Sequence, residues 1–189
     1  MNQPLNTAMD WSTLPAPEDD GAAAHLTGAA MPNLSLPATD GSTVDLSSLK
    51  GTSVVFVYPM TGRPDRDLPE NWDMIPGARG CTPQACSFRD LSQDLKAAGA
   101  DRLFGLSVQA TDYQREAAER LHLPFALLSD ASADLRKALH LPVMTVEGTE
   151  LLKRMALIIE DGVIAQTFYP VFPPDRNAQD VLDWLQKRG

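Results

Sequence analysis

The spacing of apolar residues predicts that the chain alternates between short strands and helices. A nearly continuous apolar, β-branched run at 53–58 is typical of a strand buried on both faces of a sheet. Alternating apolar and polar residues at 33–36 and 43–46 predict a hairpin before this strand, with Asp40-Gly41 at its turn. The folded part of the chain is therefore expected to begin with antiparallel strands and to continue into the centre of a sheet.

Helical periodicity begins near residue 83. Apolar residues recur with the spacing of one helix face over 83–98. Thr82 is the expected N-cap, Pro83 suits the first helical position, and Gly99 ends the helix. Further helices are predicted at 112–121, 133–139 and 178–187, and further strands at 103–108 and 125–128.

The clearest hairpin lies near the C-terminus. Two apolar runs at 155–159 and 163–168 flank Asp161-Gly162, a dipeptide typical of tight turns. Between the two hairpins, strands and helices alternate, which predicts a mainly parallel sheet covered on both faces. The predicted fold is therefore α/β and thioredoxin-like, with a mixed central sheet flanked by helices and an N-terminal β-hairpin.

Two stretches do not fit the alternation. Residues 1–24 lack periodicity and are rich in Pro, Asp, Glu and Ala, which predicts a flexible N-terminal arm before one domain at 25–189. Residues 59–80 form a long irregular connection that holds four prolines. Loops of this length are usually functional or disordered. This one leads directly to the helix predicted at 83–98.

Charge and composition exclude several kinds of partner. The 189 residues carry a net charge of −9, which would repel a phosphate backbone, so we expect no nucleic-acid partner. No segment approaches the roughly 20 apolar residues of a membrane helix, so we expect no membrane partner. The N-terminal residues do not resemble a signal peptide. We therefore expect a cytoplasmic protein whose cysteines start as thiols.

The two cysteines, Cys81 and Cys86, are the residues most suited to chemistry. A domain of this size needs no disulfide to hold its core together. Cys81 lies just before the predicted helix, where free backbone N–H groups and the positive helix end favour a thiolate. A thiolate is the reactive form of cysteine. Arg79 and Arg89 could add positive charge nearby.

The spacing of the two cysteines has a mechanical consequence. In one intact helix, Cα atoms five residues apart are separated by roughly 8–9 Å. A disulfide requires no more than about 7 Å between them. A bond between Cys81 and Cys86 would therefore require the start of the helix to unwind.

The segment GCTPQACSFRD at 80–90 resembles the G-C-T-x-x-A-C-x-F-R-D segment of the peroxiredoxin Q, or bacterioferritin-comigratory-protein, subgroup. Supporting similarities lie at 34–49, 54–59, 127–130 and 154–162. The resemblance implies that Cys81 is the peroxidatic cysteine and that Cys86 is the resolving cysteine. It also implies that Arg154 stabilises the thiolate and the charge that develops on the peroxide.

The resemblance further implies a thiol-dependent peroxidase that reduces hydrogen peroxide or organic hydroperoxides. Cys81 would become a sulfenic acid and then form an intramolecular disulfide with Cys86. A thioredoxin-like or glutathione-type reductant would restore the thiols. No cofactor and no metal are expected, and the protein would be a monomer or a homodimer.

The sequence departs from the family pattern at one place. The family usually has Thr or Ser three residues before the peroxidatic cysteine, whereas this chain has Ala78. A segment at 60–77 is inserted between the strand at 53–58 and the cysteine. Thr61 and Thr82 are the candidate replacements for the missing hydroxyl.

Other functions remain open at this point. A thiol–disulfide oxidoreductase is one alternative, although its usual motif is C-x-x-C and the spacing here is C-x-x-x-x-C. A non-enzymatic redox-sensing module could use the same disulfide switch. Two buried structural thiols are a further alternative. A metal site would need more ligands, and the three histidines are in poor register for one.

Overall fold

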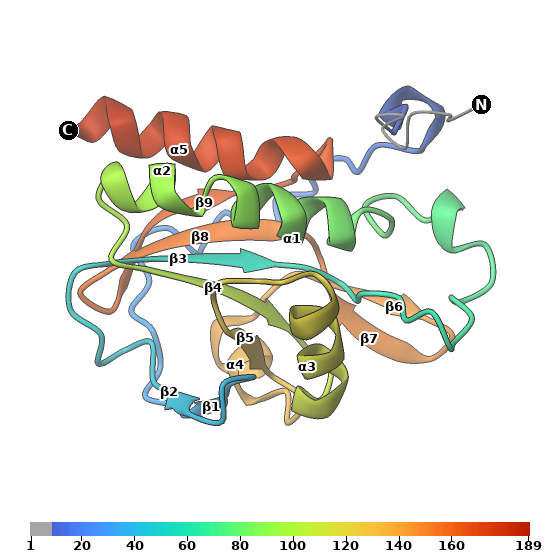
Figure 1. The fold of residues 1–189 in the computed structure, drawn as a ribbon, viewed down its shortest axis with the longest axis horizontal. Coiled ribbons are helices and arrows are strands. Elements are labelled where there is room, and N and C mark those ends of the chain that lie inside the picture. Colours follow the sequence, from blue (N-terminus) through green and yellow to red (C-terminus); the bar gives the residue numbers. More distant parts are fainter. Residues whose placement is uncertain (1–8) are drawn as a thin grey trace.

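The computed structural model describes residues 9–189. Its centre is a five-stranded sheet in the order β5-β4-β3-β8-β9, in which β5, β4 and β3 are parallel and β8 and β9 are antiparallel to their neighbours (Figure 1). The mixed sheet agrees with the sequence prediction. Its strands are β3 (Thr52–Val57), β4 (Arg102–Ser107), β5 (Leu127–Ser129), β8 (Met155–Glu160) and β9 (Val163–Phe168).

Alternate residues of β3 supply the cores on the two faces of the sheet. Val54, Phe56 and the following Tyr58 belong to one core, and Val55 and Val57 to the other. This period of two is the geometry of a pleated strand. All five side chains are almost completely buried, which explains why the sequence at 53–58 lacks an alternating polar pattern.

Helices cover the two faces. Figure 1 shows α1, α2 and α5 on one face, and α3 and α4 toward the other side of the sheet, together with the N-terminal hairpin. The hairpin is confirmed but shorter than predicted, because only Leu36–Pro37 (β1) and Thr43–Val44 (β2) pair. The helices are α1 (Cys81–Asp90), α2 (Ser92–Ala97), α3 (Thr111–Arg120), α4 (Asp134–Leu139) and α5 (Asn177–Arg188).

The helix predicted at 83–98 differs from the observed one in two ways. It begins earlier, at Cys81, with Gly80 rather than Thr82 as the N-cap. It is also divided at Leu91 into α1 and α2. The Leu91 N–H still donates to the Ser87 carbonyl at 3.0 Å, so the backbone hydrogen bonds continue through the division and the apolar face is kept.

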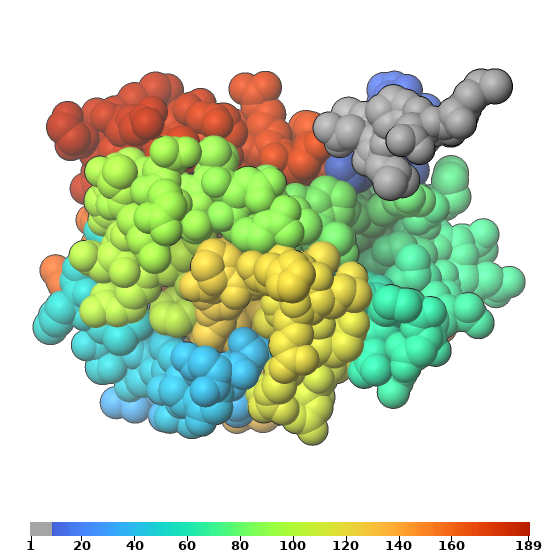
Figure 2. Space-filling view, in the orientation of Figure 1, coloured from blue at the N-terminus to red at the C-terminus, as the bar shows by residue number. Residues whose placement is uncertain are grey.

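A second small hairpin, which the sequence did not predict, holds the 59–80 loop. It consists of β6 (Val143–Val146) and β7 (Thr149–Leu152). Trp72 and Ala78 from the loop join Val146 and Leu151 in a separate apolar cluster. The loop, which includes the 3-10 turn η2 (Trp72–Met74), forms a lobe at one end of the molecule (Figure 2).

The described part of the predicted arm, residues 9–24, contacts the domain. Trp11, in the 3-10 turn η1 (Trp11–Thr13), is buried, and its indole N–H donates to Asp175 at 2.9 Å. Asp20 accepts hydrogen bonds from Lys153 at 2.6 Å and Tyr169 at 2.7 Å. The domain boundary at residue 24 stays a prediction. None of the helices within residues 9–189 is long and apolar enough to cross a membrane.

Candidate active site

Gly80 places Cys81 at the start of α1. Its φ of 114° lies in the left-handed region, which favours glycine. A Cβ at this position would lie 2.4 Å from Pro174 Cγ and 3.1 Å from the Trp11 ring. The backbone angle and the close packing therefore both require glycine here. The N-terminal segment and the turn before α5 thus pack directly against the start of the cysteine helix.

Cys81 and Arg154 meet inside the protein. Cys81 is 4% exposed and Arg154 is 2% exposed. The Arg154 Nη2 lies 3.3 Å from the Cys81 Sγ, within hydrogen-bond distance for sulfur. Arg154 directly precedes β8, which pairs with β3, so the central sheet brings the arginine to the end of β3. The structure therefore brings together two of the three residues proposed from the sequence.

The other contacts of Arg154 are neutral. Its Nη2 also donates to the carbonyls of Gly77 at 3.2 Å, Ala78 at 3.0 Å and Arg79 at 3.2 Å. No carboxylate lies within ion-pair distance of it among residues 9–189. A buried charge is costly without a partner of opposite sign. A thiolate at Cys81 would supply that partner.

Gln84 and Asn177 complete the arginine site, and the sequence analysis missed both. The Arg154 Nη1 donates to Gln84 Oε1 at 2.5 Å, and Gln84 Nε2 donates to Asn177 Oδ1 at 2.9 Å. Both amides are buried. The sequence did carry a signal for their burial. Each amide lies four positions before a buried apolar residue, Phe88 or Val181, and residues four apart share one face of a helix.

Cys86 lies in a different environment on the same helix. It is half-buried, and both cysteines are free thiols. Burial raises the pKa of the Cys86 thiol above its ordinary value, and nearby Arg89 opposes that shift only in part. Since both cysteines belong to the intact α1, helix geometry keeps their Cα atoms too far apart for a disulfide.

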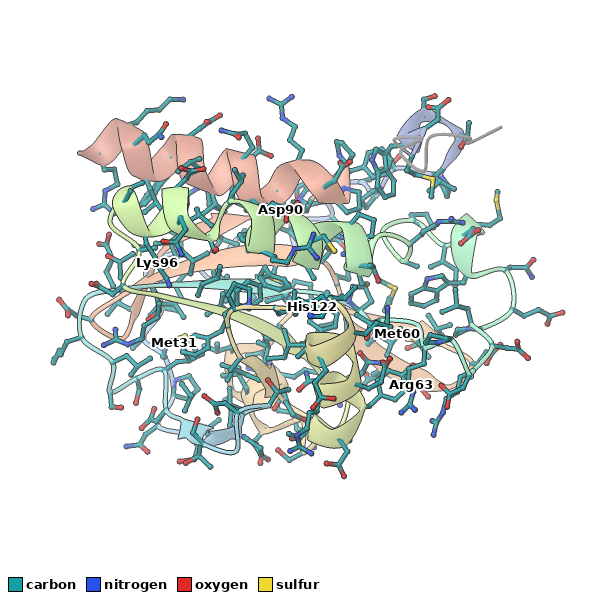
Figure 3. All side chains as sticks on the ribbon, in the orientation of Figure 1. Met31, Met60, Arg63, Asp90, Lys96 and His122 are labelled. Carbon is teal, nitrogen blue, oxygen red and sulfur yellow. The ribbon has the colours of Figure 1, made fainter. Side chains whose placement is uncertain are left out.

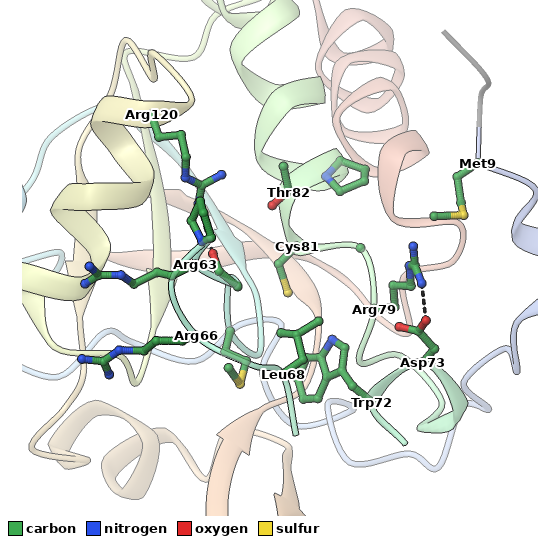
Figure 4. Close-up of a pocket in the computed structure, with 15 residues that line it drawn as sticks. Met9, Arg63, Arg66, Leu68, Trp72, Asp73, Arg79, Cys81, Thr82 and Arg120 are labelled. Atoms are coloured by element: carbon green, nitrogen blue, oxygen red, sulfur yellow. Dashed lines mark hydrogen bonds and ion pairs between the residues drawn. The ribbon is translucent and has the colours of Figure 1, made fainter. Parts of the chain in front are cut away.

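Thr61, one of the two candidates for the hydroxyl that Ala78 lacks, is bonded to other groups in this structure. The Thr61 hydroxyl donates to Gln109 Oε1 at 3.2 Å, and its carbonyl accepts from Gln109 and Tyr113. These bonds attach the loop to the end of β4 and to α3. Thr82 does line the cavity, together with Cys81 (Figure 4).

A cavity of about 480 Å³ opens above Cys81. Most of its wall comes from the 59–80 loop, and the rest comes from the start of α1, the end of α3 and Met9 of the N-terminal segment. Arg79, which the sequence analysis named as a possible source of positive charge near Cys81, lines this cavity and forms an ion pair with Asp73 (Figure 4). Ligand cavities commonly span 300–1,000 Å³, so this one is roomy enough for an organic molecule.

Within the part of the chain that the structure describes, no three His, Cys, Asp or Glu side chains cluster as metal ligands would. The site is thus a thiol, a buried guanidinium and an open cavity, which together suit attack by sulfur on a small electrophile.

Comparison with known proteins places this site in a family. The Redoxin family profile matches residues 26–182, and the chain therefore belongs to this family. Like the solved structures that it resembles, the chain has a thioredoxin-like fold. Its relatives are peroxiredoxins of the Q and Bcp type. Rice peroxiredoxin Q, a chloroplastic protein, is 32% identical over 160 residues, which cover 84% of this chain and 66% of the rice protein.

Two bacterial proteins match over nearly their whole length. Peroxiredoxin Bcp of Escherichia coli is 31% identical over 170 residues, which cover 86% of this chain and 96% of the relative. The crystal structure of peroxidoxin BcpB from Mycobacterium tuberculosis superposes with a TM-score of 0.69 at 26% identity, covering 86% of this chain and 98% of that one. The predicted fold and the predicted family are confirmed.

Proposed function

We propose that the protein is a thiol-dependent peroxidase that reduces hydrogen peroxide or organic hydroperoxides, with Cys81 as its peroxidatic residue. The observation that carries this proposal is the pairing of Cys81 with Arg154, a buried cation that has no carboxylate partner in the described chain. The guanidinium stabilises a thiolate before the reaction. It also faces the oxygen on which negative charge develops as the O–O bond breaks.

The first chemical step oxidises Cys81. Its thiolate attacks the terminal oxygen of ROOH, the O–O bond breaks, and the sulfur becomes a sulfenic acid. The leaving alkoxide takes up a proton and departs as the alcohol ROH, or as water when the substrate is hydrogen peroxide. Thr82, whose side chain lines the cavity beside the sulfur, is the group proposed to orient the peroxide.

The second step uses Cys86 as the resolving residue. Its thiol condenses with the Cys81 sulfenic acid, which forms a disulfide and releases one water molecule. A thioredoxin-like or glutathione-type reductant then donates two electrons and two protons to restore both thiols. We place the protein in the cytoplasm, where thiols are kept reduced, and expect it to act as a monomer or a homodimer.

Stopped-flow oxidation of the wild type, Cys81→Ser and Cys86→Ser tests these roles. Cys81→Ser should lower the rate of peroxide consumption by about a thousandfold or more, because the nucleophile is gone. Cys86→Ser should keep the first oxidation but lose turnover with a thioredoxin system. Loss of the first oxidation in Cys86→Ser alone would reverse the roles, and stoichiometric oxidation of the wild type without turnover would favour a redox sensor.

A further inference from the structure

The cavity above Cys81 has an apolar inner part. Figure 4 shows Leu68 and Trp72 close to the Cys81 sulfur, and Met60 also lines this space. Leu68 is 45% exposed, which is unusual for a large apolar side chain. Hydrogen peroxide needs no such surface. An apolar wall beside the thiol suits the carbon body of an organic peroxide.

The outer rim of the same cavity is cationic. Arg63, Arg66 and Arg120 line it, and Figure 4 shows Arg63 and Arg66 extending side by side away from Cys81. Figure 3 places Arg63 and Met60 together at the end of the molecule where β3 leaves the sheet. Asp73, the one acidic residue of the lining, is paired with Arg79. This concentration of positive charge is notable in a chain whose net charge is −9.

The three rim arginines are not equivalent. Arg63 pairs with Asp65 at 2.9 Å, and Arg120 pairs with Glu116 at 2.7 Å. Arg66 has no carboxylate within ion-pair distance among residues 9–189. It is therefore the rim cation whose charge is most available to a ligand.

Contacts with α3 hold this rim in place. The guanidinium carbons of Arg63 and Arg66 lie 5.3 Å and 5.6 Å from the centre of the Tyr113 ring, within the range of cation–π attraction. The Tyr113 hydroxyl donates to the Thr61 carbonyl at 3.0 Å, and Arg120 donates to the Gly62 carbonyl at 3.0 Å. The inserted loop is thus fastened to α3 with its arginines at the mouth of the cavity.

We propose that this rim selects organic hydroperoxides that carry a carboxylate at the end remote from the peroxide group. This inference rests on the proposed peroxidase function. The hydroperoxide would reach Cys81, the carbon body would lie along Leu68 and Trp72, and the carboxylate would pair with Arg66. The chemical step is unchanged: the thiolate takes the terminal oxygen, and the carboxylate-bearing alcohol leaves after protonation of its alkoxide.

A matched pair of substrates tests the proposal. The probes are cumene hydroperoxide with a para-carboxylate and the methyl ester of the same compound, which differ mainly in charge. We expect kcat/KM to favour the acid by about fivefold, the effect of one partly exposed ion pair. The preference should shrink as salt is added, because screening weakens exposed charge pairs.

Variants assign the preference to one side chain. Arg66→Ala should bring the acid-to-ester ratio close to one, and Arg66→Lys should keep much of it because the charge remains. The matched control is Arg115→Ala, which removes an arginine of α3 that pairs with Asp112 and does not line the cavity. This control should leave the ratio unchanged.

Two readouts separate failure of this proposal from failure of the peroxidase function. Hydrogen peroxide oxidation of Cys81 reports on the function alone. Calorimetric binding of the carboxylated alcohol and its ester to the reduced protein reports on the rim alone, with or without turnover. Equal kcat/KM and equal binding for acid and ester in the wild type would overturn the proposal, as would a preference that persists in Arg66→Ala.

Discussion

The two thiols of α1 share one helix but differ in their burial and in the charged groups that contact them. Cys81 is buried at the first turn against the Arg154 guanidinium, with its sulfur 3.3 Å from Nη2. Cys86 lies one and a half turns further on, half-buried, in surroundings that raise the pKa of its thiol. Burial near a cation favours a thiolate, whereas burial in apolar surroundings favours the thiol. The direct contact of a buried guanidinium with the Cys81 sulfur thus distinguishes the two cysteines, because Arg89 offsets the burial of Cys86 only in part.

The contrast is compatible with the complementary roles proposed for the pair. A nucleophile has to be ionised before it meets the peroxide. A resolving thiol reacts only after the first oxidation, and it must stay unreactive toward peroxide until then. Keeping the second thiol protonated and outside the Arg154 site satisfies both requirements. The following experiments are arranged from the largest expected effect to the smallest.

Removal of the Arg154 guanidinium should remove most of the difference in peroxide reactivity between Cys81 and Cys86. In Arg154→Met, the oxidation of Cys81 by hydrogen peroxide should slow by about a hundredfold or more, because the thiolate and the transition state lose their stabilising charge. Stopped-flow fluorescence measures the rate. Lys153→Met is the matched control, since this neighbour pairs with Asp20 and lies outside the cavity at Cys81.

The effect of losing Arg154 also has to be separated from misfolding, since the side chain donates to three backbone carbonyls and to Gln84. Circular dichroism and a urea titration of Arg154→Met and Arg154→Lys provide that check. A folded Arg154→Met protein that oxidises at the wild-type rate would contradict the assignment of the buried cation to Cys81.

Oxidation should join the two cysteines in a disulfide and unwind the start of α1. The wild-type disulfide requires the start of α1 to unwind, so the oxidised protein should lose roughly one or two turns of helical circular dichroism signal. Trp11, which packs over Gly80 at this helix start, should report the same change by fluorescence. In Cys86→Ser neither change should follow peroxide treatment. A disulfide-bonded wild type with undiminished helix would contradict the mechanism.

The pH dependence of alkylation tests the environment of Cys86 directly. In a Cys81→Ser background, the iodoacetamide reaction of Cys86 should rise with pH around a midpoint above that of the unfolded chain, because burial raises the pKa of this thiol. The folded state then holds the proton more tightly, so Cys86 should also make the folded state slightly less stable as pH rises between the two midpoints. A folded-state midpoint at or below the unfolded one would contradict this.

The sequence by itself determined the elements whose stability is mostly local or repeated along the chain. The apolar run at 53–58, the hairpin around Asp161-Gly162 and the apolar face of α1 each follow from a period that is visible in the sequence. The cysteine segment also carried enough residues to indicate the family. These features could be predicted because alternation and helical spacing report directly which face of an element is buried.

The β6–β7 hairpin was missed because its turn is formed by Glu147 and Gly148, both with positive φ, and glutamate is not a residue that such turns favour. Without that hairpin, the partner of the 59–80 loop could not be recognised. The loop itself has no periodic pattern, and its arrangement depends on Trp72 and Ala78 packing against strands some 70 residues later in the chain.

The contacts at the candidate active site also depend on tertiary packing. The identity of Cys81 and Arg154 as candidates came from the sequence, but their 3.3 Å contact exists because β3 and β8 pair in the sheet. The roles of Gln84 and Asn177 and the arginine rim of the cavity depend on contacts between elements that are distant along the chain. Local patterns determine which elements form, whereas the charge beside Cys81 is decided only when tertiary packing brings the distant Arg154 to it.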